Sequence, residues 1–237
     1  MSLKDDVSSE IDGVLSQAWD IRDGTVVPET DDVALAGGGV NLKATMLYAD
    51  LADSTALSTS FDRRIAAKVI KSFLAASSRI IRAQGGYIRS FDGDRVMAVY
   101  LGDLKNTSAA KTTLMINWAV LQLLRPKVEA KYPSLKDGGY TIQHCVGVDT
   151  SEVLVARAGI RNNNDLVWIG RSPNAAAKLA TLRESPYHSY LTKDVYDVLA
   201  EEAKLGGDPK RPMWEARTWK PAPGIDTVYR SSWTWGL

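Results

Sequence analysis

The order of the apolar segments is the feature that most constrains how this chain folds. Short strand-like runs alternate with two long helical patterns. In chain order they are a strand at 44–50, a helix at about 62–83, strands at 87–92 and 95–101, a helix at about 107–131 and a strand at 140–149. This β-α-β-β-α-β order predicts an α/β (α+β) domain with a ferredoxin-like core, extended by further strands and helices toward the C-terminus.

Two acidic residues stand where predicted strands end or begin. Asp50 ends the first strand, and Asp94 follows the Asp-Gly dipeptide of the turn between the second and third strands. The first and third strands of a ferredoxin-like sheet are antiparallel neighbours, so Asp50 and Asp94 are expected to converge. With Ser54 and Thr55 close by, the carboxylates would suit divalent cations carrying a nucleoside triphosphate. The alternative is two unrelated surface turns.

Length and composition favour one large globular domain. We expect a helical lead-in at 1–41, based on an amphipathic pattern at 4–19, and a main domain at 42–237. The net charge of +1 provides no broad basic field for nucleic acid or an anionic membrane. The sequence shows neither a signal peptide nor a run of about 20 apolar residues. A soluble cytoplasmic protein is therefore expected.

The cysteine and histidine content argues against zinc, disulfide or histidine-triad chemistry. Cys145 is the single cysteine of the sequence, and its place in a strand pattern predicts a buried thiol. His144 and His188 have no acidic or thiol partner nearby in the sequence. We expect both histidines to be structural or on the surface.

The segment after residue 140 combines strand patterns with a well-marked helix start. Residues 141–160 are expected to form a hairpin, and 164–170 a further strand. Ser172 is a suitable N-cap for the helix that follows. Asn174 and Lys178, four residues apart, are expected to share one face of that helix.

Four segments resemble, in the same order, the motifs of class III nucleotidyl cyclase catalytic domains. They are YADLADSTAL, FDGDRVMAVY, VGVDTSEVL and WIGRSPNAAAKLA, and the resemblance covers residues 42–232. It implies a head-to-tail homodimer with two interface sites. In each site Asp50 and Asp94, with the Leu51 carbonyl, would hold two Mg²⁺ or Mn²⁺ ions while the ribose 3′-hydroxyl attacks the α-phosphorus and pyrophosphate leaves.

The resemblance also implies roles for residues of the other protomer and of the C-terminal segment. Asn174 matches the residue that orients the ribose, and Lys220 matches a phosphate-binding lysine. Lys178 stands where the family usually has a transition-state arginine. Because lysine lacks a planar fork, bidentate contact with phosphate is lost at that place. Arg171 and Arg157 are the alternatives for supplying the fork.

The base-reading positions depart from those of purine cyclases. Ser90 and Val167 stand at the two places where these cyclases carry a polar pair. Val167 cannot hydrogen-bond a purine edge, and each unpaired group would cost about 1 to 3 kcal/mol. Trp168 and Tyr48 would fill the space that a smaller base leaves, and Arg89 or Ser90 would donate to uracil O4.

Within the class, the chain is most similar to the uridylate cyclases among the pyrimidine cyclases of Pycsar antiphage defence. The segments YADLADST, IRSFDGDRVM and NDLVWIGRSPN carry this similarity. It implies conversion of UTP to cyclic UMP, which activates a separate effector. A cytidylate cyclase is the first alternative, followed by an adenylate or guanylate cyclase and a silent nucleotide-binding module. A diguanylate cyclase is disfavoured because FDGDR lacks a GGDEF-like turn.

Overall fold

A computed structural model describes residues 2–220 and 223–237. The chain divides into two compact units. The terminal unit holds the residues up to Lys43 together with Glu152–Gly170, and the main unit holds Ala44–Ser151 and Arg171–Leu237. No helix in the described part of the chain is both long and apolar enough to cross a membrane.

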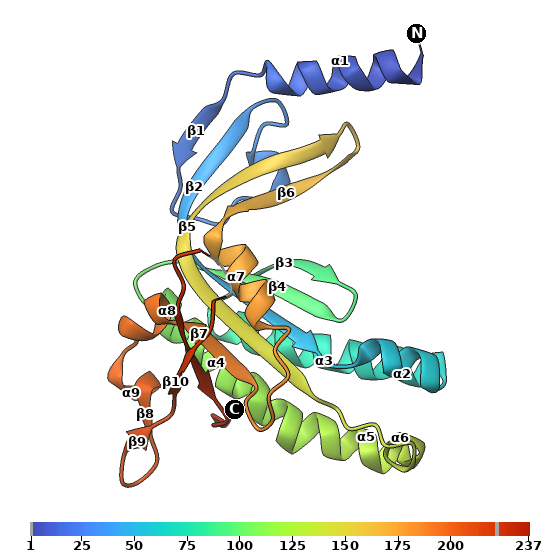
Figure 1. Ribbon diagram of the computed structural model, residues 1–237, viewed down its shortest axis with the longest axis vertical. Helices are drawn as coiled ribbons and strands as arrows, with labels where there is room; N and C mark the ends of the chain where they lie inside the picture. The colour runs from blue at the N-terminus through green and yellow to red at the C-terminus, as the bar shows by residue number, and fades with distance from the viewer. Residues whose placement is uncertain (1, 221–222) are drawn as a thin grey trace. The chain divides into compact units, whose positions relative to one another are not determined.

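The strands of the main unit follow the order β10-β11-β7-β5-β2-β4-β3 (Figure 1). Their bounds are β2 Gly38–Leu51, β3 Tyr87–Asp92, β4 Arg95–Tyr100, β5 His144–Ile160, β7 Ser189–Thr192, β10 Glu215–Thr218 and β11 Thr227–Ser231. Strand β2 is antiparallel to β4 and lies between β4 and β5. This is the predicted ferredoxin-like order, with β7, β11 and β10 as the expected C-terminal extension.

Helices of the main unit pack on both faces of the sheet (Figure 1). They are α2 Ser54–Ser60, α3 Arg63–Ala83, α4 Lys105–Ala119, α5 Arg125–Lys131, α6 Pro133–Asp137, α7 Arg171–Leu179, α8 Lys193–Asp197 and α9 Glu201–Lys204. Phe73 of α3 and Leu114 of α4 share one core with Val146 of β5. Cys145 packs with Leu179 of α7 in another. Since neighbouring strand residues point to opposite faces, α7 covers the face opposite α3 and α4.

The second long helical pattern forms a nearly continuous helix that contains a proline. Between α4 and α5 lies a π-helical segment, η2, at Val120–Leu124. Pro126 follows it in the first turn of α5, where a missing N–H is tolerated. The prediction of helix at about 107–131 is therefore confirmed, and so is the helix at 62–83.

The hairpin predicted within residues 141–160 is wrong. Residues His144–Ile160 form the single long strand β5, which then pairs with β6 at Asn163–Gly170. The turn falls at Arg161 and Asn162, where Asn162 has a φ of 69°. Asparagine tolerates this conformation, whereas the stretch 149–152 holds neither glycine nor asparagine and stays extended.

The terminal unit contains α1 Leu3–Leu15, β1 Asp20–Asp23, the 3₁₀ turn η1 Thr30–Asp32, the first part of β2 and the β5–β6 hairpin. The predicted helix at 4–19 is present but ends at Leu15. Its start is fixed by Ser2, which caps the helix in a reciprocal hydrogen bond with Asp5. None of its residues is buried. A short additional sheet pairs β8 Leu205–Gly206 with β9 Arg211–Pro212, in the main unit.

Candidate active site

A cleft of about 580 Å³ opens at the C-terminal end of β2. Five residues singled out from the sequence line it, namely Asp50, Leu51, Ser54, Thr55 and Asp94. They come from the end of β2, the start of α2 and the β3–β4 turn. Strand order thus brings the two acidic residues to one place, as the sequence predicts.

Asp50 is almost fully buried, with 5% of its surface exposed. Its Oδ1 accepts a hydrogen bond from Arg95 Nε at 3.0 Å, and its Oδ2 accepts one from Arg183 Nη2 at 2.6 Å. Arg95 lies directly opposite Asp50 in the ladder between β2 and β4. Two guanidinium groups therefore bind one carboxylate at this end of the cleft, and such groups can also bind an anionic ligand.

Asp94 and the α2 hydroxyls are positioned by backbone turns. Gly93 has a φ of 59°, which lets the chain reverse tightly between β3 and β4 and leaves Asp94 half-buried in the cleft. Asp53 has a φ of 56° and turns the chain from β2 into α2. The first residues of α2, Ser54 and Thr55, consequently face the cleft beside Asp50.

Asn174, Lys178 and Lys220 do not line this cleft within their own chain. Asn174 and Lys178 are exposed on α7, four residues apart. Helix α7 can sit close to β5 because a Cβ on Gly147 would lie 2.3 Å from the Ala176 carbonyl oxygen. Lys220 is exposed and forms an ion pair with Asp226 at 3.3 Å.

The predicted base-reading residues are also outside the cleft. Ser90 and Arg89 lie on the edge strand β3, where the Ser90 hydroxyl contacts Met97 Sδ at 3.6 Å. Val167 and Trp168 lie on β6 of the terminal unit, and Val167 is 39% exposed. A single copy of the chain therefore assembles the acidic half of the predicted site.

Comparison with known proteins places the chain in a family. No protein-family model matches it. It is 47% identical to a uridylate cyclase from Rhodovulum sp. (strain MB263), over 98% of this chain and 97% of that protein. It is 40% identical to a uridylate cyclase from Xanthomonas perforans, over the full length of both. The chain belongs to the uridylate cyclase family.

A solved structure gives the fold of this uridylate cyclase family member independently. A bacterial light-regulated adenylyl cyclase superposes with a TM-score of 0.69 at 22% identity, covering 83% of this chain and 53% of that one. At this identity the match concerns the fold alone. It confirms the expected fold of class III cyclase catalytic domains.

Sequence reasoning missed two arginines of the cleft. Arg95 could have been found from the β2–β4 register, because it directly follows Asp94 and pairs with Asp50. Arg183 gives no local signal, since it lies between α7 and β7 and reaches Asp50 from 133 positions along the chain. The two arginines that were considered, Arg171 and Arg157, do not line the cleft and bind Asp149 and Asp31.

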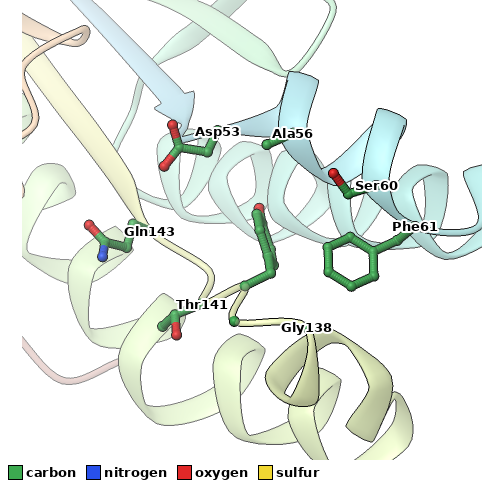
Figure 2. A pocket seen from close by; sticks show the side chains of 9 residues that line it. Asp53, Ala56, Ser60, Phe61, Gly138, Thr141 and Gln143 are labelled. Carbon is green, nitrogen blue, oxygen red and sulfur yellow. The ribbon is translucent and has the colours of Figure 1, made fainter.

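A second hollow, of about 360 Å³, shares Asp53 with the cleft. Figure 2 shows Ser60 and Phe61 at one side of it and Thr141 and Gln143, from the segment before β5, at the other. The hydroxyl of Tyr140 donates to the Ala52 carbonyl at 3.3 Å. Burial, followed by the charges of Asp53 and Asp94, raises the pKa of Tyr140 to about 12, so this phenol stays protonated at neutral pH.

Proposed function

We propose that the protein converts UTP to 3′,5′-cyclic UMP and pyrophosphate. The observation that carries this proposal is the meeting of Asp50, Asp94, Ser54 and Thr55 in one cleft, in a chain that is 47% identical to a uridylate cyclase. Carboxylates for cations and two arginines for phosphate oxygens suit a triphosphate that arrives with divalent cations. The reaction would be in-line attack of the ribose 3′-hydroxyl on the α-phosphorus.

The donor set of the cleft fits Mg²⁺ or Mn²⁺. Asp50 and Asp94 provide carboxylate oxygens and Leu51 a backbone carbonyl, and hard cations prefer such oxygen ligands. No group of three or more histidine, cysteine or acidic side chains with metal-site spacing occurs among the described residues. The substrate phosphates would complete the ligand set. Bound ions would lower the pKa of the 3′-hydroxyl and neutralise the triphosphate.

The chain's own residues would bind and orient the nucleotide. Ser54 and Thr55 offer hydroxyls at the cleft, and the guanidinium of Arg95 adds positive charge next to Asp50. These groups would hold the triphosphate oxygens while the carboxylates hold the cations. Positioning of this kind supplies much of the catalysis in phosphoryl transfer.

A second copy of the chain would complete the site. Asn174 and Lys178 share an exposed face of α7, which leaves them accessible to another protomer. In a head-to-tail homodimer Asn174 would orient the ribose, Lys178 would neutralise charge on the α-phosphate, and Lys220 would bind the triphosphate.

The base preference for uracil rests on the positions that would read the base edge. Val167 is apolar and partly exposed, and it offers no hydrogen bond to a purine. Trp168 would narrow the pocket, while Ser90 or Arg89 would donate to uracil O4. CTP is the runner-up substrate because cytosine has the same size and differs in the exocyclic group at C4.

The decisive test is to incubate the purified protein with each of the four ribonucleoside triphosphates and Mn²⁺. We expect cyclic UMP as the main product. Asp50→Ala and Asp94→Ala should each reduce the rate by more than about 100-fold, while size-exclusion chromatography still shows the dimer. Cyclic AMP as the main product would overturn the base assignment, and an active Asp50→Ala or Asp94→Ala variant would overturn the two-cation assignment.

In the cell, we propose that cyclic UMP made in the cytoplasm is the messenger of an antiphage response and activates a separate effector. The support is the similarity to pyrimidine cyclases of Pycsar defence. Cells that express the protein should accumulate cyclic UMP after phage infection, and cells that express the Asp50→Ala variant should not. An unchanged cyclic UMP level upon infection would contradict this role.

A further inference from the structure

Arg183 binds the carboxylate of Asp50, which the proposed reaction needs as a cation ligand. Its Nη2 donates to Asp50 Oδ2 at 2.6 Å, and the side chain of Asp50 is 8% exposed. Arg95 binds the other carboxylate oxygen. In this state the charge of Asp50 is already neutralised, so a divalent ion can bind Asp50 only by competing with a guanidinium group.

The two arginines differ in how firmly they are tied to Asp50. Arg95 lies opposite Asp50 in a continuous β-ladder, so its position follows from the sheet. Arg183 belongs to the segment between α7 and β7. Its other terminal nitrogen, Nη1, donates to the carbonyls of Ala180 and Leu182, both at 2.9 Å. Arg183 is thus held by backbone at one nitrogen and presents the other to the cleft.

This arrangement allows a change of partner with little movement. A divalent ion at Asp50 would bring two positive charges beside two guanidinium groups and would repel them. The triphosphate would bring the compensating negative charges into the same cleft, beside Ser54 and Thr55. Because the guanidinium is a rigid plane, a small tilt of the whole group about Nη1 would carry Nη2 from the carboxylate to a phosphate oxygen.

We propose that Arg183 exchanges Asp50 for the substrate triphosphate when the cation binds. In the free protein it neutralises the buried carboxylate and weakens cation binding, and in the complex it binds phosphate. It thereby supplies a guanidinium to a site where Lys178 cannot offer a fork. The inference rests on the proposed function and adds a coupling between cation and nucleotide binding.

The test measures binding without turnover. Mn²⁺ affinity is determined from the electron paramagnetic resonance signal of free Mn²⁺, with and without a non-cyclisable methylene analogue of UTP. The variants are Arg183→Gln, Arg183→Lys and, as a matched control, Arg64→Gln. Arg64 is an arginine on the surface of α3 whose side chain is 86% exposed.

Arg183→Gln should bind Mn²⁺ alone about tenfold more tightly than the wild type and should bind the analogue about tenfold more weakly at saturating Mn²⁺. Arg183→Lys keeps the charge, so its Mn²⁺ affinity should stay within about twofold of the wild type while analogue binding weakens. Arg64→Gln should change neither affinity.

Unchanged or weaker Mn²⁺ binding by Arg183→Gln would overturn the exchange, as would tighter Mn²⁺ binding with unchanged analogue affinity. Thermal melting checks that each variant is folded. If Arg183→Gln fails to fold, the test uses Arg183→Lys. In this variant the factor by which the analogue increases Mn²⁺ affinity should be about fivefold smaller than in the wild type. An unchanged coupling would then refute the proposal.

The outcome is separable from that of the proposed function. If the wild type makes no cyclic UMP but Arg183→Gln shows the expected changes in Mn²⁺ and analogue affinity, the cyclase assignment is refuted and the exchange is supported. An active wild type whose Arg183→Gln variant has wild-type Mn²⁺ affinity refutes the exchange alone.

Discussion

Two buried aspartates of the main unit are bound by arginine, and their surroundings differ. Asp149 of β5 is fully buried and accepts hydrogen bonds from Arg171 Nε and Nη2, both at 3.1 Å, and from the Thr192 hydroxyl at 2.5 Å. Arg171 also binds Asp194 and the Thr150 carbonyl. Asp149 thus sits inside a closed network of protein groups.

Asp50 accepts its side-chain hydrogen bonds from the guanidinium groups of Arg95 and Arg183, and it borders an open cleft with Asp94. Its partners Arg95 and Arg183 have side chains that are 28% and 34% exposed. The same residue types therefore serve two purposes. A carboxylate enclosed by neutral and charged donors holds elements together, whereas one paired at the edge of a cleft can exchange its partners for a ligand.

The largest difference is expected when each carboxylate is removed. Asp149→Ala leaves Arg171 and the Thr192 hydroxyl without their buried acceptor and should lower the free energy of unfolding by about 3 kcal/mol. Asp50→Ala should lower it by less than about 1 kcal/mol, because both released arginines are partly exposed and no buried hydroxyl like that of Thr192 loses its acceptor. Urea unfolding of the two variants measures the difference.

A neutral replacement of Asp149 tests the difference between the two aspartates further. Burial is the main cause that raises the pKa of Asp149, so the fold tolerates loss of its charge better than loss of its oxygens. Asp149→Asn should therefore be more stable than Asp149→Ala. Equal stabilities of Asp50→Ala and Asp149→Ala would contradict the distinction between an open and a closed site.

The sequence was sufficient to predict the acidic part of the cleft because strand order determines it. Asp50 and Asp94 meet as neighbours of adjacent antiparallel strands, and this follows from the β-α-β-β-α-β pattern without any side-chain detail. Buried Cys145 was predicted for a similar reason, since its place in an apolar strand determines its environment. Burial raises the pKa of this thiol to about 12, so it is unreactive.

Arg183 of the cleft could not be predicted from strand order in the same way. Arg183 reaches Asp50 only because the segment after α7 returns to the end of β2, and no periodic pattern marks that return. The hairpin expected at 141–160 failed because the polar stretch 149–152 resembles a turn in sequence, although it holds neither glycine nor asparagine and stays extended within β5. The roles of Asn174, Lys178 and Val167 depend on a second copy of the chain and stay predictions.

Replacing each arginine by lysine should have smaller effects on stability, and these should again differ between the two sites. Arg171→Lys loses the two-pronged contact with Asp149 and should destabilise the protein by roughly 1.5 kcal/mol. Arg183→Lys keeps one charge beside Asp50 and should melt within about 2 °C of the wild type. Thermal melting compares the two variants. A larger drop in melting temperature for Arg183→Lys than for Arg171→Lys would show that Arg183 contributes more to stability than Arg171.

The smallest effect concerns pH, to which the two buried histidines and Asp149 contribute with opposite signs. His144 and His188 stack at a ring distance of 4.9 Å, and burial lowers the pKa of both. For His144 the neighbouring His188 and, more weakly, Arg125 and Arg183 add to this lowering. Below pH 6.5 the unfolded chain therefore takes up protons that the folded chain refuses, and stability falls as the pH falls. The raised pKa of Asp149 acts oppositely, since its protonation in the folded state favours folding at acidic pH.

We expect the free energy of unfolding to fall by roughly 1 kcal/mol between pH 7 and pH 5.5. His144→Leu should reduce this decline, because it removes the more deeply buried of the two rings. Neither ring nitrogen of His144 has a hydrogen-bond partner in the described part of the chain, so an apolar side chain forfeits no such bond there. Urea unfolding at both pH values measures the slope. A variant with the same decline as the wild type would assign the acid sensitivity to other groups.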